Sequence, residues 1–205
     1  LMQEPNVIKL LKSDLKFSDS SIKKLKIFVR SVIESNKKYN FISKTSEIDI
    51  WHRHVLDSAQ LVKFINFKNG SLADLGSGAG FPGIVLAIFN SNVDFHVKLY
   101  EKSPVKSAFL KKIVDQLDLN AKILKNIYDD KIESDYIVCR AFKKLDRIIQ
   151  VSREIAKKPH KLIVLKGQNA QEEANNAFQN NKYPYKLESS MTNDKSKIII
   201  AKFEK

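Results

Sequence analysis

The sequence predicts an α/β fold in which a doubly wound, mostly parallel sheet ends in an antiparallel hairpin and is preceded by a helical region. Three observations lead to this fold class. Residues 1–69 carry apolar side chains mainly at helical spacing, and from residue 70 onward short apolar runs alternate with helical segments. Four of the six glycines also lie together between Gly76 and Gly83, directly after the first apolar run. We therefore expect an N-terminal helical cap over residues 1–69, packed on the same core as a domain over residues 70–205.

The N-terminal region is predicted to contain two long amphipathic helices. The first opens with cap-type residues at positions 18–21 and continues to residue 40, with apolar side chains three or four positions apart. The second covers residues 47–67, and Asn69 followed by Gly70 is a typical stop signal.

The remainder of the chain alternates between strands and helices. Strands are expected over residues 71–75, 95–101, 121–126, 135–140 and 161–167. Helices are expected over residues 81–90, 103–119, 142–158 and 169–180. The final segments, 185–191 and 196–205, are joined by the turn-rich residues 192–195, which predicts a hairpin at the end of the sheet.

The composition is typical of a soluble globular protein with a large positive charge. The 205 residues include 36 basic and 23 acidic side chains, which gives a formal net charge of +13. Such a surplus favours polyanionic partners such as nucleic acid, although the many lysine, asparagine and isoleucine residues are also typical of an AT-rich genome. No apolar run reaches the roughly 18 residues of a membrane span, so we expect no membrane association.

Cysteine and histidine usage excludes further classes of site. Cys139 is the single cysteine, so an internal disulfide is impossible and a reducing compartment is expected. The N-terminus lacks the long apolar stretch of a signal peptide, and we therefore expect a cytoplasmic protein. No cysteine or histidine cluster has the spacing of a zinc site, so no metal is expected.

The glycine cluster, between a predicted strand and a predicted helix, indicates a ligand-binding turn at the carboxyl edge of the sheet. The dinucleotide fingerprint G-x-G-x-x-G fails when it is counted from Gly76, because Phe81 takes the third glycine position. The same fingerprint is satisfied when it is counted from Gly78, with Gly80 and Gly83 following. The cluster by itself therefore leaves a nicotinamide dinucleotide open as the ligand.

The residues around the cluster resemble class I S-adenosylmethionine (SAM) methyltransferases. Asp74 stands two residues before Gly76, and the resulting D-x-G-x-G-x-G is similar to the first motif of that class, whose glycine turn passes close to the amino-acid part of SAM. In that class an acidic residue at the end of the next strand binds the ribose hydroxyls, and Glu101 stands there. A carboxylate can accept both hydrogen bonds of a vicinal diol; the alternative for Glu101 is a solvated helix cap.

Six segments together resemble one family, the bacterial RsmG (GidB) methyltransferases, which methylate guanine N7 in 16S ribosomal RNA. In family order they are YNFIS (39–43), RHVLDSAQL (53–61), DLGSGAGFPGIVLAI (74–88), KSAFLKKI (106–113), CRAFKKL (139–145) and LKGQ (165–168). The glycine string preceded by RHVLDS is a specific combination. The resemblance implies a Rossmann-like methyltransferase sheet, a SAM cofactor, and 16S ribosomal RNA or the small ribosomal subunit as partner, with no obligate protein partner.

The family's cofactor contacts carry over one residue at a time. The resemblance implies contacts at Gly76, Gly78, Gly80, Phe81, Glu101, Tyr128, Asp129 and Arg140. Tyr128 and Asp129 match a pair expected near the adenine, and Arg140 matches the arginine that follows the fourth strand. Two positions depart from the family pattern, because Ile127 and Ser107 stand where the family often has arginine. These departures weaken the expected local phosphate contacts rather than the cofactor site.

His54 and Asp57 are the two candidates for a catalytic role, at the edge of the cofactor or guanine pocket. They lie three residues apart on the second predicted helix and therefore share a face. The alternative is a hydrogen-bonded pair that locks the cap onto the sheet.

Three basic residues are candidates for contacts with RNA phosphate: Arg53, Lys106 and Lys166. Arg53 belongs to a local cationic cluster at residues 52–54. Lys166 ends the fifth predicted strand, where a solvated lysine beside a turn glycine is the alternative. For Arg140, whose rigid fork of donors suits a carboxylate or a phosphate, the alternative is a surface salt bridge.

The chemistry of guanine N7 requires no general base. N7 carries an in-plane lone pair and no proton, so methyl transfer is a direct displacement and the enzyme mainly aligns the reacting atoms. The deep, narrow major groove of an RNA helix hides N7, so we expect the target in a loop or an extruded nucleotide. The alternatives are a SAM-dependent methyltransferase of a small molecule, an NAD-dependent dehydrogenase, and an RNA-binding module without enzymatic activity.

Overall fold

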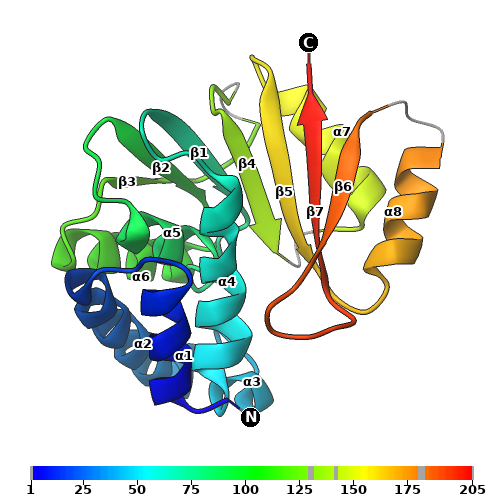
Figure 1. Ribbon diagram of the computed structural model, residues 1–205. Coiled ribbons are helices and arrows are strands. Elements are labelled where there is room, and N and C mark those ends of the chain that lie inside the picture. The colour runs from blue at the N-terminus through cyan, green and yellow to red at the C-terminus, as the bar shows by residue number, and fades with distance from the viewer. Residues whose placement is uncertain (1, 129–131, 141–142, 180–182, 205) are drawn as a thin grey trace.

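A single mixed sheet organises the molecule. The structure, a computed structural model, describes residues 2–128, 132–140, 143–179 and 183–204. Within these residues seven strands form one sheet in the order β3-β2-β1-β4-β5-β7-β6 (Figure 1). Strands β1 to β5 run parallel, whereas β7 is antiparallel to both β5 and β6. The predicted α/β class with a C-terminal hairpin is therefore confirmed.

The strands coincide with the apolar runs of the sequence. Their bounds are β1 (Gly70–Leu75), β2 (Phe95–Tyr100), β3 (Ala121–Leu124), β4 (Tyr136–Arg140), β5 (His160–Lys166), β6 (Tyr185–Ser189) and β7 (Lys197–Phe203). The last strand lies inside the sheet and β6 forms its edge. Residues 198–201 of β7 are all buried, whereas β6 has no buried residue and carries Lys186 and Glu188. Charged side chains of this kind protect a sheet edge from further pairing.

Helices cover both faces of the sheet. Those between the strands are α5 (Gly83–Phe89), α6 (Pro104–Gln116), α7 (Leu145–Ile155) and α8 (Ala170–Gln179). Residues of α5 and α6 belong to one hydrophobic cluster, and residues of α7 and α8 belong to a second. Leu72 of β1 joins the first cluster while Ala73 and Leu75 join the second, as the alternation of a strand requires. No helix in the described part of the chain has the length and apolar character to cross a membrane.

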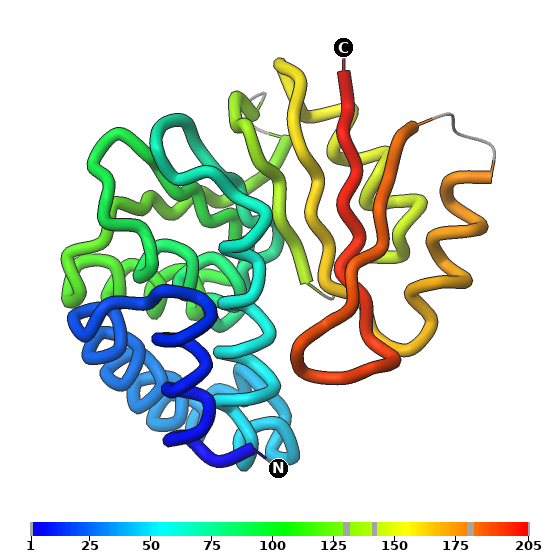
Figure 2. Tube along the Cα trace, in the orientation of Figure 1, coloured from blue at the N-terminus to red at the C-terminus, as the bar shows by residue number. Residues whose placement is uncertain are grey.

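The N-terminal helices lie on the α5–α6 side and gather at one end of the sheet, drawn from blue to cyan in Figure 2. Their bounds are α1 (Glu4–Ser13), α2 (Asp19–Tyr39), α3 (Lys44–Glu47), the π-helix η1 (Trp51–Leu56), α4 (Asp57–Ala59) and the 3₁₀-helix η2 (Gln60–Phe64). Helix α2 begins as predicted, because Ser18 Oγ accepts a hydrogen bond from the Ser21 amide at 3.0 Å. It ends at Tyr39, and the following Asn40 caps it with a left-handed φ of 50°.

The cap and the sheet share one hydrophobic core. Phe28 of α2 packs on Phe81 of the glycine turn, with ring centroids 5.1 Å apart. Both side chains belong to the same cluster as the first face of the sheet. A division of the chain at residue 69 stays a prediction.

The prediction of one regular helix over residues 47–67 is wrong. Helix α3 ends at Glu47, and residues 51–64 then change from π-helical to α-helical to 3₁₀ geometry. The carbonyl of Arg53 accepts a hydrogen bond from Arg140, 87 residues away, at 3.1 Å. The donor of this hydrogen bond thus belongs to the sheet and not to the helix itself. Single π-helical turns are frequent at functional sites. Periodicity alone does not reveal such a bond.

Candidate functional site

The carboxyl ends of four parallel strands bring predicted site residues into one row. Strands β2, β1, β4 and β5 are neighbours, and the residues at or just after their carboxyl ends are Glu101, Gly76, Arg140 and Lys166. The registers, continued by one or two residues, place them in this order along one edge. Neighbouring strands lie about 4.8 Å apart, so Arg140 is roughly two strand spacings from Glu101.

The glycine turn is anchored to the end of β2. The amides of Gly76 and Ser77 both donate to the Tyr100 carbonyl at 3.0 Å. Gly76 has a φ of 71°, a left-handed conformation that side chains with a Cβ rarely adopt. Gly83 has a different role, because a Cβ there would overlap Leu99 of β2 and Asp74. Gly83 therefore permits close packing of helix on strand, which is the role of the third glycine in the dinucleotide fingerprint as well.

The carboxylate of Glu101 is held in place by backbone amides. Its Oε2 accepts a hydrogen bond from the Gly78 amide and its Oε1 accepts one from the Ser103 amide, both at 2.8 Å. Ser107, at a position where the resemblance predicts arginine, donates from Oγ to the Glu101 carbonyl at 2.8 Å. The serine thus braces the strand end that carries the carboxylate.

A pocket of about 270 Å³ opens beside Glu101. Gly76, Tyr100 and Ile127 contribute to its lining, and Tyr128 borders it as an exposed side chain. Three exposed lysines also line it: Lys102, Lys125 and Lys143. Ile127, at a position where the resemblance predicts arginine, is buried in the second hydrophobic cluster and supplies an apolar wall. Asp129 lies outside the described residues.

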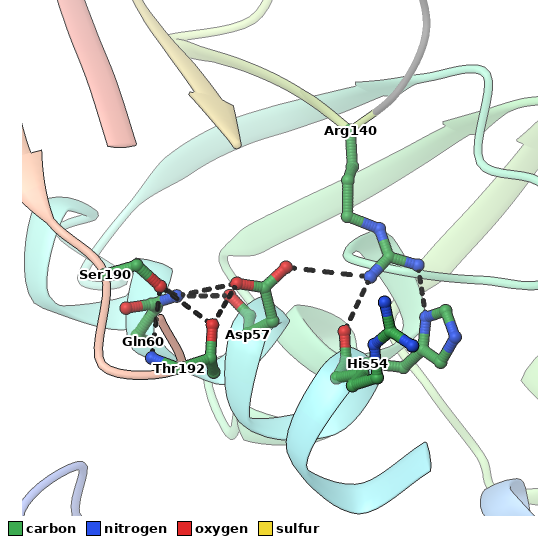
Figure 3. Close-up of polar contacts among 7 residues, drawn as sticks. His54, Asp57, Gln60, Arg140, Ser190 and Thr192 are labelled. Carbon is green, nitrogen blue, oxygen red and sulfur yellow. Dashed lines mark hydrogen bonds and ion pairs between the residues drawn. The ribbon is translucent and has the colours of Figure 1, made fainter. Parts of the chain in front are cut away.

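Arg140 is held between β4 and the π-helix (Figure 3). Its guanidinium donates to the Arg53 carbonyl at 3.1 Å and to His54 Nδ1 at 2.5 Å, and it lies 3.6 Å from the Asp57 carboxylate. It also stands over the Phe81 ring at 5.5 Å. The guanidinium that was expected to meet a ligand is therefore already engaged by the cap, and Phe81 lies beneath it rather than against the 270 Å³ pocket.

The contact with Arg140 determines the protonation of His54. A guanidinium can only donate, so Nδ1 must accept and the neutral ring carries its proton on Nε2. Burial, together with the charges of Arg140 and Arg53, lowers the pKa of His54 to about 3. His54 is therefore neutral, and the one nitrogen that could accept a proton is occupied.

Asp57 connects the cap to the hairpin. Its Oδ1 accepts hydrogen bonds from Gln60 Nε2 at 3.0 Å and from Thr192 Oγ1 at 3.1 Å. Gln60 in turn receives a hydrogen bond from the Met191 amide at 2.7 Å and donates to Ser190 Oγ at 3.0 Å. Figure 3 shows the Asp57 carboxylate between Arg140 and Thr192. Burial raises the pKa of Asp57, and Arg140 and Thr192 oppose that effect.

No pattern in the sequence predicts the contacts that this network makes with the hairpin loop. Ser190 and Thr192 are ordinary polar residues of the loop between β6 and β7, and they lie 130 and 135 positions along the chain from their partners Gln60 and Asp57. Only the position of the hairpin loop against η2 brings them together. His54 and Asp57 both contact Arg140 of β4, and a catalytic role for either residue stays a prediction.

A second pocket, of about 360 Å³, lies beside Asp57 and Arg140 on the β5 side of the row. Lys166 and Glu173 also line it, together with Ser190 and Lys197. The Lys166 ammonium contacts the Glu173 carboxylate at 2.8 Å and donates to the Lys143 carbonyl at 2.9 Å. Its predicted contact with RNA phosphate stays a prediction, but the charge already has a partner within the protein.

The other two basic candidates lie on either side of the row. Arg53 is exposed and lines a neighbouring pocket of about 420 Å³ with His52 and Asn193. Lys106 is half-buried in the first turn of α6, one turn after Ser103. Neither position is shown to bind a ligand.

Several buried groups bear on the possible chemistry. Cys139 is fully buried and burial raises the pKa of its thiol, which disfavours a thiolate nucleophile. Burial also raises the pKa of Asp74 to about 7, while its Oδ2 accepts from the Gly83 amide at 3.0 Å. Within the described ranges no group of three or more His, Cys, Asp or Glu side chains could hold a metal ion.

Comparison with known protein families gives one match over most of the chain. The family model of rRNA small subunit methyltransferase G (GidB) matches residues 21–199. A protein of Orientia tsutsugamushi named ribosomal RNA small subunit methyltransferase G is 35% identical over 186 residues, 90% of this chain and 92% of the relative. The protein of that name from Pelagibacter ubique is 34% identical over 182 residues, covering 86% of this chain and 85% of the relative.

Solved structures support the fold. A SAM-dependent methyltransferase from Aquifex aeolicus superposes with a TM-score of 0.57 at 15% identity, over 78% of this chain and 99% of that one. A SAM-dependent O-methyltransferase from Thermotoga maritima gives a TM-score of 0.56 at 18% identity, over 73% and 65% of the two chains. At these identities the likeness shows the fold alone.

Proposed function

The chain belongs to the rRNA small subunit methyltransferase G family, and from this premise we propose that it transfers the SAM methyl group to N7 of a guanine in 16S ribosomal RNA. It is a SAM-dependent rRNA methyltransferase. Membership in the family also favours SAM over a dinucleotide, although Gly83 packs as the dinucleotide fingerprint requires.

The proposal rests on one observation. The Glu101 carboxylate is held in a fixed orientation beside a glycine turn whose backbone a ligand can approach closely. Glu101 is oriented by two amides at the mouth of the 270 Å³ pocket and can accept hydrogen bonds from a vicinal diol. Tyr100 and Ile127 offer apolar walls that fit an adenine, and Tyr128 borders them. The acceptor carboxylate and the apolar walls of this pocket therefore fit an adenosyl group.

The remaining cofactor contacts are part of the proposal. Gly76, Gly78 and Gly80 would let the amino-acid end of the cofactor approach the turn. Asp129 would border the adenine, and Phe81 and Arg140, which lie against each other, would complete the cofactor site. When bound, the cofactor supplies an electrophilic methyl group on a positively charged sulfur.

The side chains near the row fit a reaction without a general base. Guanine N7 has no proton to remove, and His54 is neutral with its Nδ1 occupied by Arg140. The protein's contribution is then to hold the base so that N7 faces the methyl carbon. Arg53 and Lys106 are proposed to hold RNA phosphates, and the net charge of +13 supports an RNA partner.

Incubation of small-subunit RNA with the protein and labelled SAM tests this proposal. Methylation at N7 leaves a fixed positive charge on the base, so reduction followed by aniline cleaves the chain at the modified guanine. We expect one cleavage site that needs both protein and SAM, and labelling that falls steeply with added salt. Labelled RNA that resists aniline would reject N7, and label found only in small molecules would favour a small-molecule methyltransferase.

A further inference from the structure

The 360 Å³ pocket lies next to the proposed cofactor pocket along the row of strand ends. Glu101 lines the cofactor pocket, Gly76 and Arg140 follow, and the second pocket begins at Arg140 and continues to Lys166. Because Gly76 lies between Glu101 and Arg140 along this edge, a cofactor held by its ribose at Glu101 and extended across the glycine turn would have its reactive end on the Arg140 side. The second pocket is thus where an acceptor base would meet it.

We propose that this pocket holds the acceptor guanine and that the Asp57 carboxylate recognises the N1–H and 2-amino groups of that base. This inference rests on the proposed function, because it assigns the acceptor side of the same reaction. Guanine presents these two donors next to each other, whereas adenine presents an acceptor at N1. A fixed carboxylate therefore accepts guanine and rejects adenine.

The contacts of Asp57 fix the orientation of its carboxylate without using all of its hydrogen-bond acceptor sites. Its donors come from three separate elements: Arg140 of β4, Gln60 of η2 and Thr192 of the hairpin loop. Gln60 and Thr192 both bond Oδ1, and Arg140 lies 3.6 Å from Oδ2. A carboxylate has about four acceptor sites, so Oδ2 above all keeps room for donors from a ligand. The Asp57 side chain is 17% exposed and lines the pocket.

The other carboxylate of the pocket is less suited to this role. Glu173 accepts from the Lys166 ammonium at 2.8 Å and from the Leu145 amide at 3.1 Å, both through Oε2. Its cation is thus in direct contact at 2.8 Å, closer than the 3.6 Å between Arg140 and Asp57, and Glu173 also caps the first turn of α7. Glu173 provides a matched control in the same cavity.

Asp57 also favours the transition state of the reaction. Guanine N7 donates its lone pair to the methyl carbon, the carbon–sulfur bond breaks, and its electron pair remains on sulfur. The positive charge passes to the base while the N1 proton stays in place. The N1–H and 2-amino groups become stronger donors as this charge develops, so a carboxylate facing them binds the transition state more tightly than the substrate.

The test compares guanine with inosine at the modified position. Inosine keeps N7, O6 and N1–H but lacks the 2-amino group. The site is first mapped by aniline cleavage, and RNA is then assembled with either base there. For the unmodified protein we expect kcat/KM to be on the order of tenfold to a hundredfold higher for guanine, the range of one hydrogen bond to a charged group. Equal rates for the two bases would overturn the assignment without any variant.

Variants then identify the residue responsible. Asp57→Asn is expected to reduce kcat/KM on guanine RNA by on the order of a hundredfold and to bring the guanine-to-inosine ratio close to one. SAM affinity, measured by calorimetry, should remain within about twofold, since the cofactor half is untouched. Glu173→Gln should retain the ratio of the unmodified protein.

The outcomes separate the inference from the proposed function. An Asp57→Asn protein that is slower on both RNAs but retains the full ratio would make Asp57 a structural residue and overturn the inference. If that variant does not fold, Thr192→Val removes one donor that orients the carboxylate, and an unchanged ratio there would likewise count against it. Failure of the unmodified protein to label N7 at all would instead contradict the proposed function, and the inference with it.

Discussion

The two halves of the ligand edge are built in different ways. In the half proposed to bind the cofactor, backbone groups of nearby segments hold one carboxylate, and the Gly78 amide and Glu101 are 23 residues apart. In the half proposed to bind the acceptor base, side chains hold one another across the fold: Arg140 meets His54 over 86 residues, and Thr192 meets Asp57 over 135. The first half depends on local conformation, whereas the second depends on the docking of three separate parts of the chain.

This difference predicts which property each half controls. Changes in the half proposed to bind the cofactor should alter ligand affinity with little loss of stability, because Gly76 and Glu101 there are only partly buried. Changes in the acceptor half should alter stability first, because they leave buried polar groups without partners. Four substitutions test this contrast.

The largest effect is expected for Arg140→Met. The substitution leaves the Asp57 carboxylate and His54 Nδ1 in a buried region without their cationic donor. Breaking a buried pair by removal of one partner costs about 3–5 kcal/mol of the free energy of unfolding, which denaturant titration would measure. The Arg140→Met, Asp57→Asn double variant should recover part of that loss. A stability change below about 1 kcal/mol would place Arg140 among ordinary surface ion pairs.

Gly76→Val is expected to abolish most of the cofactor binding. The φ of 71° disfavours a β-branched residue, and the new side chain would occupy the pocket beside Glu101. We expect SAM affinity to fall at least about a hundredfold, near 2.7 kcal/mol, while circular dichroism remains that of a folded protein. Gly167→Val is the control, since a Cβ there meets nothing within 4 Å. Normal SAM affinity in Gly76→Val would remove this turn from the cofactor site.

Glu101→Ala should weaken SAM by about 1–3 kcal/mol, through loss of charge-assisted hydrogen bonds to the ribose. Calorimetry with SAM and with an analogue that lacks one ribose hydroxyl distinguishes this contact from an indirect effect. The analogue should lose less affinity than SAM on substitution. An equal loss for both ligands would mean that Glu101 acts only by holding the Gly78 and Ser103 amides.

His54→Asn should produce the smallest change at neutral pH, and this change in the free energy of unfolding should depend on pH. In the folded protein the pKa of His54 is lowered to about 3 from an ordinary value of 6.5. As the pH falls below 6.5 the unfolded chain binds a proton that folded His54 does not, so stability is lost as pH falls through this window. The loss approaches about 1.4 kcal/mol per pH unit at most and is under about 1 kcal/mol at pH 6.

In the His54→Asn variant an amide oxygen replaces Nδ1 as the acceptor for Arg140, and the titrating group is gone. The free energy of unfolding of the variant relative to the unmodified protein should therefore rise from pH 7 to pH 4. Asp74 changes the free energy of unfolding with pH in the opposite direction, because burial raises its pKa to about 7. Its contribution cancels in the comparison, because Asp74 is present in both proteins. A difference that stays constant with pH would show that folded His54 titrates normally.

Local patterns predicted the elements that depend on local forces. Helix α2 begins at its serine cap, the strands follow the apolar runs, and Gly76 turns the chain with a positive φ. The same patterns failed over residues 47–67, where a bond from Arg140 accompanies a change of helical pitch. They also did not reveal the salt bridge that occupies Lys166.

The sequence by itself determined the fold class, the glycine turn and the position of Glu101, because apolar period, backbone freedom and strand ends are properties of neighbouring residues. Only the tertiary structure decided that Arg140 faces the cap, that Asp57 lies between Arg140 and the hairpin, and that β7 runs inside β6. The physical reason is the length scale of the interactions. A hydrogen bond between side chains more than 80 residues apart forms only after the sheet, the cap and the hairpin have packed, and no short stretch of sequence records that packing.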